Sequence, residues 1–478
     1  MTDLTRRSFL LALGGSQLLL RSAAGAKLNV LFILIDDMGW RDLGCYGSTF
    51  YETPNIDRLA AQGMRFTNAY AACPVCSPTR ASIMTGKYPA RLHLTDWIPG
   101  RKQWPTARVL TPQFNQQLPL EEITIAEALK PEGYATASIG KWHLGDKGFL
   151  PQDQGFDVNV AGSKAGSTSS YFAPYPLDNI EGPAGEYLTD RLTDEAIKFV
   201  THNKERPFFL YLPHYAVHLP LQAKQKLIEK YQAKTPKDGQ KDPVYAAMID
   251  SLDQGVGRLM KSLDDLNLTG KTVVFFMSDN GGVIFEGRRQ EPVTSNAPLR
   301  AGKGHLYEGG IREPMFVRWP GVVKPGSQCD TPVSSIDFFP TIVEMAGIRK
   351  VPAHDVDGVS FTSLLKGAGA LKRDAIYWHY PHYSNQGGVP GGAVRQGDYK
   401  LIEFYGDSKV ELYNLRNDIG EQHDLSRSEP QKAARLRQML HDWRKSVDAV
   451  MPTPNPNYDP AKADQGLTGT QNKDEVDD

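Results

Sequence analysis

Asn29-Val30-Leu31-Phe32-Ile33-Leu34-Ile35 is an apolar run that ends at a pair of aspartates, Asp36 and Asp37. A continuous apolar run of this length is typical of a strand that is buried on both faces of a sheet. The same signal predicts further strands at residues 135–139, 207–212 and 271–277. Helices are predicted in the intervening chain, at residues 54–63, 124–130, 188–203 and 245–266. This alternation predicts an α/β fold with a large mixed, mostly parallel sheet flanked by helices.

Polar side chains follow each of these predicted strands. The four groups are Asp36-Asp37, Lys141-Trp142-His143, the pair His214 and His218, and Ser278-Asp279-Asn280. Open α/β sheets bind their ligands beyond the carboxyl ends of the strands. We therefore expect four groups that are far apart in sequence to meet at one edge of the sheet.

Composition excludes some classes of partner. The chain has 478 residues, and its 54 Lys+Arg nearly balance its 55 Asp+Glu. Such a balance gives no global field toward nucleic acid or an anionic membrane, so no nucleic-acid partner is expected. The four cysteines, Cys45, Cys73, Cys76 and Cys329, are too few for a disulfide scaffold and lack zinc-site spacing.

The N-terminal residues 1–26 are interpreted as an export signal. Thr5-Arg6-Arg7-Ser8-Phe9-Leu10 resembles a twin-arginine signal, and Ala24-Gly25-Ala26 is typical of a cleavage site. The alternatives are a membrane anchor or a chance arginine pair, although the apolar run is short for spanning a bilayer. We expect a periplasmic or secreted protein with no stable membrane insertion after signal cleavage.

The pattern changes near residue 370, so residues 27–369 are assigned to a catalytic domain. Short strands joined by Gly/Asp turns are predicted at residues 376–380, 392–395, 399–402 and 410–413, followed by a helix at 431–450. Residues 370–450 are therefore expected to form a smaller α+β subdomain on a short antiparallel sheet. The polar tail, residues 451–478, is expected to be poorly ordered.

Oxygen ligands dominate two of the polar groups. Asp36, Asp37, Asp279 and Asn280 carry the carboxylate and amide oxygens that Ca²⁺ and Mg²⁺ prefer. The alternative is that such aspartates cap helices or turns, which is the commoner role of any one Asp-Asp pair. Their position after two buried strands favours a site for a divalent cation.

Cys76-Ser77-Pro78-Thr79-Arg80 and Gly140-Lys141-Trp142-His143-Leu144-Gly145 resemble the two signatures of type I sulfatases, in the alkaline phosphatase superfamily. The resemblance extends from Leu28 to about Leu425. In that family the cysteine is oxidised to formylglycine (3-oxoalanine). The resemblance thus implies as partner a formylglycine-generating or anaerobic sulfatase-maturing enzyme. The alternative is that Cys76 stays a buried apolar cysteine.

The resemblance also implies roles for particular residues. Asp36, Asp37, Asp279, Asn280 and the modified Cys76 would hold Ca²⁺, which the family favours over Mg²⁺. One hydroxyl of the hydrated aldehyde would attack sulfur, and the second would then eject sulfate. The remaining catalytic candidates stabilise charge or transfer protons: Arg80, Lys141, His143, His218 and Lys303. His214 is interpreted as structural, or as a residue that supports those in contact with the substrate.

The substrate is predicted to be a sulfated carbohydrate, cleaved in an exo-acting manner. Aromatic and cationic side chains suit sulfated sugars, and the candidates for contact are Trp97, Arg101, Arg300, His305, His379, His382 and Arg395. Ordinary packing is an equal alternative for the aromatic residues. Two other functions stay open: a phosphonate or phosphate diester hydrolase of the same superfamily, and a glycan-binding protein with unmodified Cys76.

Overall fold

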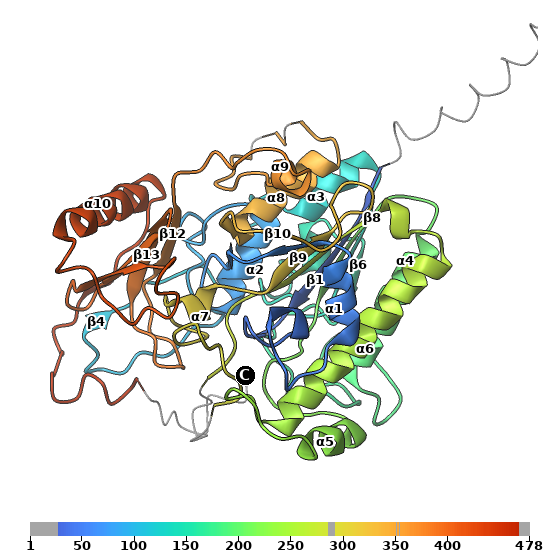
Figure 1. Ribbon diagram of the computed structural model, residues 1–478, viewed down its shortest axis with the longest axis horizontal. Coiled ribbons are helices and arrows are strands. Elements are labelled where there is room, and N and C mark those ends of the chain that lie inside the picture. Colours follow the sequence, from blue (N-terminus) through green and yellow to red (C-terminus); the bar gives the residue numbers. More distant parts are fainter. Residues whose placement is uncertain (1–26, 285–291, 350, 353, 468–478) are drawn as a thin grey trace, which may run out of the picture.

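A computed structural model describes residues 27–284, 292–349, 351, 352 and 354–467. Its centre is an eight-stranded sheet (Figure 1). In spatial order the strands are β10 (Ser327–Cys329), β2 (Met64–Phe66), β9 (Met315–Arg318), β8 (Thr272–Ser278), β1 (Asn29–Ile35), β7 (Phe208–Pro213), β5 (Ala135–Ile139) and β6 (Val158–Val160). The block from β8 to β6 is parallel, whereas β9 runs antiparallel to both β8 and β2. The predicted mixed, mostly parallel sheet is confirmed.

Helices cover both faces of this sheet, as the alternation of side chains along a strand requires. Leu31, Ile33 and Ile35 of β1 belong to one core cluster, and Val30, Phe32 and Leu34 belong to the other. The first cluster includes residues of α1 (Pro54–Ala61), α4 (Leu188–His202), α5 (Gln225–Gln232) and α6 (Pro243–Asp265). The second includes residues of α2 (Cys76–Thr85), α3 (Ile125–Leu129), α8 (Phe338–Met345) and α9 (Thr362–Leu365).

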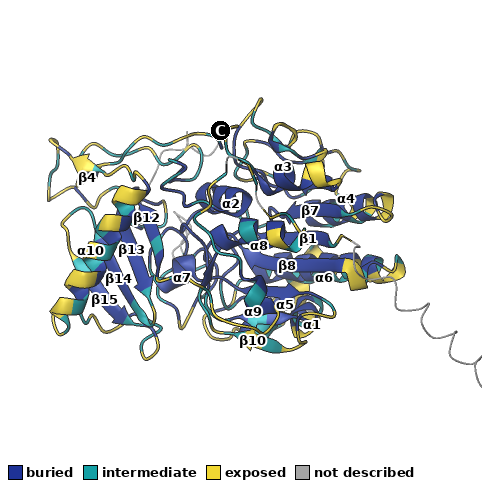
Figure 2. Cartoon of the chain, turned by 90° about the horizontal axis from the view of Figure 1, so that it is seen from above, coloured by how far each residue is buried: buried dark blue, intermediate teal, exposed yellow. Residues whose placement is uncertain are grey.

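The C-terminal part forms a second, smaller layer structure beside the main sheet (Figure 2). Its antiparallel sheet has the order β12 (Ile376–Tyr380), β13 (Gly391–Gln396), β14 (Tyr399–Phe404) and β15 (Val410–Asn414). Helix α10 (Pro430–Ser446) packs on one face through Leu436, Leu440 and Trp443. The other face contributes Trp378 and Ile402 to a core shared with Tyr70 and Val75 of the main domain. The predicted α+β arrangement is confirmed.

The first part of the polar tail is packed, contrary to the poor order expected from its composition. Strand β16 (Thr453–Pro454) pairs with β4 (Val109–Leu110), and the Asn455 amide donates to the carbonyls of Pro105 and Ala107 at 2.9 and 2.6 Å. The indole of Trp104 donates to the carbonyl of Ala463 at 2.9 Å. The tail therefore fixes the loop that follows residue 96.

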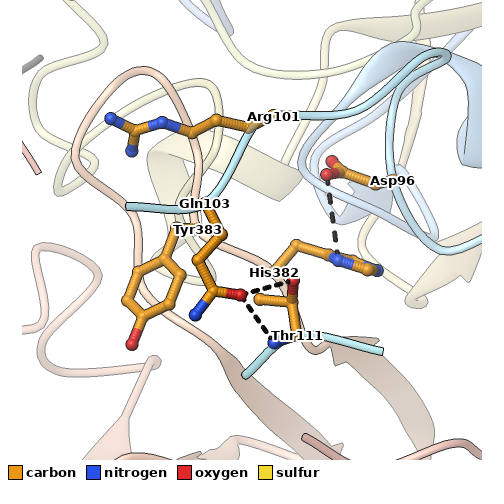
Figure 3. A pocket seen from close by; sticks show the side chains of 6 residues that line it. All are labelled: Asp96, Arg101, Gln103, Thr111, His382 and Tyr383. Carbon is orange, nitrogen blue, oxygen red and sulfur yellow. Dashed lines mark hydrogen bonds and ion pairs between the residues drawn. The ribbon is translucent and has the colours of Figure 1, made fainter. Parts of the chain in front are cut away.

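That loop and the segment after β12 enclose a small pocket (Figure 3), lined by Asp96, Arg101, Gln103, Thr111, His382 and Tyr383. Arg101 bridges its walls, because its guanidinium donates to the carbonyl of Ser384 at 2.8 Å and also to that of Gly466. The pocket is therefore held by three chain segments that are distant in sequence.

Most of the predicted elements lie within one to four residues of their expected bounds. Four strands of the main sheet, β2, β6, β9 and β10, were not predicted. The short pair of β3 (Ala69–Tyr70) with β11 (Val333–Ser334) and the helices α5, α7 (Glu308–Ile311), α8 and α9 were also missed. Among the described residues, no helix is both long and apolar enough to cross a bilayer. The predicted export signal at residues 1–26 lies outside the described residues.

Candidate active site

Cys76 is the first residue of α2 and lies at the centre of the site. The chain enters the helix through Val75 in an extended conformation, and every residue of α2 is buried. The Sγ atom of Cys76 lies 3.6 Å from Oδ1 of Asp36, which follows β1. Burial raises the pKa of the Cys76 thiol to about 12, so an unmodified thiol is protonated at neutral pH. All four cysteines carry free thiols.

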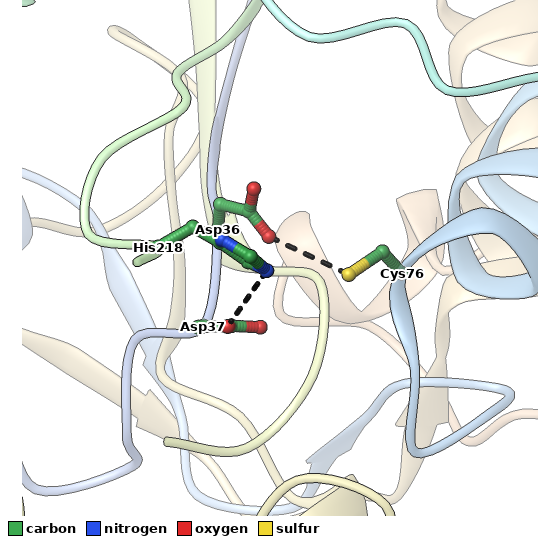
Figure 4. A group of neighbouring side chains, drawn as sticks. All are labelled: Asp36, Asp37, Cys76 and His218. Carbon is green, nitrogen blue, oxygen red and sulfur yellow. Dashed lines mark hydrogen bonds and ion pairs between the residues drawn. The ribbon is translucent and has the colours of Figure 1, made fainter. Parts of the chain in front are cut away.

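Asp36, Asp37, Cys76 and His218 converge from three segments (Figure 4). Each offers one potential ligand atom, and these atoms lie within 4.8 Å of one another. Both aspartates are buried, and Nε2 of His218 lies 3.5 Å from Oδ2 of Asp37. Asp37 has a positive φ of 60°, which is uncommon for a residue other than glycine. The groups that follow β1 and β7, Asp36-Asp37 and His218, therefore meet at Cys76.

Two lysines contact these aspartates. Lys141 lies 2.7 Å from Oδ2 of Asp36, and Lys303 lies 2.8 Å from Asp37. Burial opposes ionisation of Asp37, but the ammonium groups of Lys303 and Lys141 hold its pKa well below the usual range. Burial likewise disfavours the charged form of Lys303, but Asp37 keeps the pKa of Lys303 above its ordinary value. Both partners of this pair are therefore ionised at neutral pH.

Arg80 joins the fourth polar group to the same centre. It lies one helical turn beyond Cys76, so both side chains share a face of α2. Its Nε donates to Oδ2 of Asp279 at 2.9 Å, and Nη1 donates to the backbone carbonyl of Lys141 at 2.9 Å. Its side chain is fully buried. Arg80 therefore fixes Asp279, Lys141 and the helix relative to one another.

The donor set fits a hard divalent cation. Asn280 donates from its amide nitrogen to Oδ1 of Asp37 at 2.7 Å, while its buried Oδ1 has no hydrogen-bond partner among the described residues. Burial and the neighbouring Asp36 raise the pKa of Asp279 to about 6, despite Arg80. An orphaned amide oxygen beside crowded carboxylates is the chemistry that Ca²⁺ or Mg²⁺ would satisfy.

The histidines differ in their surroundings. His218 is the partly exposed member, with 19% of its side chain exposed, and its Nδ1 lies 2.9 Å from the carbonyl of Leu219. Burial, followed by the charge of Lys303, lowers the pKa of His218 to about 3. His143 is buried, and its Nε2 lies 2.6 Å from the carbonyl of Ile98. His214 is buried as well, and burial lowers its pKa to about 4, which suits the structural role predicted for it.

The residues predicted to contact substrate lie in two groups. Trp97 and Arg101 flank Ile98, whose backbone bonds both Ser77 and His143. His305 lies two residues beyond Lys303 and contacts its carbonyl. These three candidates therefore lie on segments next to the site. His382 lies behind Thr95, with Nε2 and Oγ1 2.8 Å apart.

The other three have their described polar contacts within the C-terminal part or with its neighbours. His379 bonds Tyr405 and the carbonyl of Val450. Arg395 bonds Asn68 and Tyr70, and Arg300 bonds Tyr413 and the carbonyl of Glu421. None of these contacts is to a member of the cluster around Cys76, so a role in substrate binding stays a prediction.

Several supporting residues were missed by sequence reasoning. Asp42 accepts hydrogen bonds from Gly39, Tyr245 and Thr294 and so fixes the turn that follows Asp37. Lys400 and Glu421 form a fully buried ionic group with Glu308. The sequence signal for this ionic group was Lys400 itself, a charged residue within the predicted strand at residues 399–402.

The similarity of this chain to known proteins extends over most of its length. The family model for sulfatases matches residues 28–348, and a model for the C-terminal part of N-sulphoglucosamine sulphohydrolase matches residues 301–447. A protein of Formosa agariphila named sulfatase is 34% identical over 88% of this chain and 89% of its own length. Arylsulfatase A of Homo sapiens is 34% identical over 85% of this chain and 86% of its own. The crystal structure of Ps i-CgsB in complex with k-i-k-neocarrahexaose has a TM-score of 0.76 at 30% identity, over 92% of this chain and 96% of that one.

Proposed function

Since the chain belongs to the sulfatase family and is a sulfuric ester hydrolase, we propose that it removes sulfate from a carbohydrate through a formylglycine made from Cys76. One observation carries this proposal. Cys76 lies at a helix N-terminus 3.6 Å from Asp36, inside a group that joins Asp37, Lys141 and Lys303. An ordinary buried cysteine would not need two lysines and several carboxylates around it.

Asp36, Asp37, Asp279 and Asn280 would hold the cation, which we propose to be Ca²⁺. The unpartnered Oδ1 of Asn280 supports this assignment, as does the raised pKa of Asp279. When bound, such an ion would polarise the sulfuryl oxygens and favour the ionised form of the attacking hydroxyl. Mg²⁺ is the alternative.

The chain's own cations would bind and orient the sulfate group. Lys141 and Lys303 are buried ammonium groups on either side of the aspartate pair, where they can neutralise charge that develops on sulfuryl oxygens. Arg80 would act by holding Asp279 and the backbone of Lys141 in place. The N-terminus of α2 adds backbone dipoles that favour an anion at position 76.

The leaving oxygen needs a proton, and two groups can supply it. His218 is the partly exposed member of the cluster around Cys76, and its Nε2 is the ring nitrogen that faces Asp37. Its depressed pKa keeps the imidazole neutral, so the proton has to come from a charged donor. We propose that the protonated Lys303 supplies it and that His218 passes it to the leaving oxygen. His143, held by the carbonyl of Ile98, would assist removal of a proton at position 76.

A carbohydrate substrate is supported by the residues on segments next to the site and by one structural relative. Trp97, Arg101 and His305 would add the aromatic and polar groups that suit a sulfated sugar. Ps i-CgsB, with its bound k-i-k-neocarrahexaose, shares the fold at 30% identity. We propose exo action on an oligo- or polysaccharide. The sugar and the sulfate position would be identified with a panel of defined sulfated mono- and disaccharides.

A comparison of two model substrates tests the reaction class. Turnover of an aryl sulfate should exceed that of an aryl phosphodiester, and the reverse order would favour a phosphonate or phosphate diester hydrolase. Mass spectrometry of the peptide from Ala72 to Lys87 tests the modification, which exchanges sulfur for oxygen and removes two hydrogens. An active protein whose Cys76 is unmodified would refute the formylglycine proposal. We also propose export, which N-terminal sequencing of the mature protein would test.

A further inference from the structure

We propose that Lys400 and Glu421 are positioning residues that keep Lys303 in place beside Asp37. This inference rests on the proposed function of Lys303 as a sulfate-binding group. Both residues belong to the C-terminal part of the chain. Lys400 lies in β14, and Glu421 lies in the turn after β15. The C-terminal subdomain thereby contributes to the reaction of the main domain.

Lys400 and Glu421 both bind Glu308, the first residue of helix α7. Nζ of Lys400 lies 2.9 Å from a carboxylate oxygen of Glu308 and 2.9 Å from one of Glu421, and all three side chains are fully buried or nearly so. The second oxygen of Glu421 accepts the backbone N–H of Glu308 at 2.7 Å. Glu421 thus takes the place of the N-cap, since the N-cap residue Tyr307 makes no side-chain hydrogen bond to the helix.

Helix α7 in turn holds the segment that carries Lys303. The N–H of Gly309 donates to the carbonyl of Arg300 at 2.9 Å, and the carbonyl of Glu421 accepts from the Arg300 side chain at 2.9 Å. Both ends of the segment 300–308 are therefore tied to Glu421. A side chain at Gly309 would collide with the carbonyls of Ala301 and Arg300, so helix and segment touch backbone to backbone.

The same helix also contacts the segment after Asn280. The N–H of Gly281 donates to the carbonyl of Gly310 at 3.2 Å, and the N–H of Lys303 donates to the carbonyl of Gly282 at 3.2 Å. A shift of α7 would thus move Lys303 relative to Asp37. Misplacement of a charged group by about 1 Å can cost on the order of 100-fold in rate.

A double-mutant cycle separates positioning from general stability. In an active preparation with an aryl sulfate, Lys303→Ala should lower kcat/KM by about 100-fold or more. Lys400→Met should lower it by about 10- to 100-fold in the otherwise unchanged protein, chiefly through kcat. In the Lys303→Ala background the same Lys400→Met change should cost less than about 3-fold, because the group that it positions is gone.

The matched control is Lys445→Met, the same substitution at an exposed site on α10 of the same subdomain, which should leave kcat/KM within about 2-fold. Equal losses from Lys400→Met in both backgrounds, or no loss at all, would overturn the inference. If Lys400→Met does not fold, Glu421→Gln takes its place, because it removes the charge but keeps an acceptor for the Glu308 N–H.

Failure of the proposed function would be seen in a different measurement, the activity of the unmutated protein. Without turnover of sulfate esters by the unmutated protein, the proposed function fails before any variant is compared. Hydrogen exchange gives a readout that needs no turnover. Lys400→Met should speed exchange of the amides between residues 300 and 312 by about 10-fold or more while leaving α2 unchanged. Unchanged exchange between residues 300 and 312 would overturn the positioning role.

Discussion

Replacement of Arg80 by methionine tests how the buried charges of the site are balanced. The guanidinium donates from Nε to Asp279 at 2.9 Å and from Nη1 to the Lys141 carbonyl at 2.9 Å, and its Nη2 forms an ion pair with Asp279 at 2.8 Å. Methionine has a similar length but leaves the Asp279 carboxylate and the Lys141 carbonyl without this partner. Removal of one member of a buried ion pair costs about 3–5 kcal/mol, so we expect a loss of that size in the free energy of unfolding.

The assay is urea unfolding at pH 7 in metal-free buffer, followed by tryptophan fluorescence. Arg416→Met is the matched control, because that side chain is 73% exposed and bridges Asp398 at the surface, so it should cost less than about 1 kcal/mol. The Arg80→Met loss should also shrink toward pH 5, as the isolated Asp279 takes up a proton. A loss no larger than that of the control at pH 7 would refute the reasoning.

Three further predictions follow from the same structure. Cys76→Ala should lower turnover by at least about three orders of magnitude but shift the urea midpoint little; substantial residual activity would count against the mechanism. Ca²⁺ at about 100 times its Kd should raise the free energy of unfolding by about 2.7 kcal/mol, and an unchanged melting temperature on adding Ca²⁺, or the same rise in Asp36→Asn, would contradict the proposed ligand set. His379 bonds Tyr405 and the Val450 carbonyl, and burial lowers its pKa from 6.5 to about 4. Between these two pH values the imidazole is neutral in the folded protein but protonated in the unfolded chain, so unfolding takes up a proton and is favoured as the pH falls. Between pH 6.5 and pH 4, the free energy of unfolding should fall by about 3 kcal/mol more in the unmutated protein than in His379→Gln. Parallel pH profiles of the urea midpoint in the two proteins would argue against this assignment.

Local pattern was enough to predict the α/β class and the four adjacent strands β8, β1, β7 and β5, but not the other four strands of the sheet. Strand β1 was predicted at its observed bounds because seven residues in a row signal burial on both faces. Helix α7, with four residues, was missed, since so short a helix is held by Glu421, Lys400 and Gly281 rather than by its own pattern. The packing of the tail was missed for the same reason, because Asn455 and Trp104 find partners about 350 residues away.

The sequence by itself determined which residue types follow each strand, and thereby that carboxylates, lysines and histidines gather at one edge of a parallel sheet. That outcome is local, because the register of parallel strands places their carboxyl ends together. Only the tertiary structure decided the pairing within this set: Lys141 with Asp36, Lys303 with Asp37, and Arg80 with Asp279. It also decided that Arg300, His379 and Arg395 bond to other groups. Such pairings depend on distances between segments that no short-range pattern encodes.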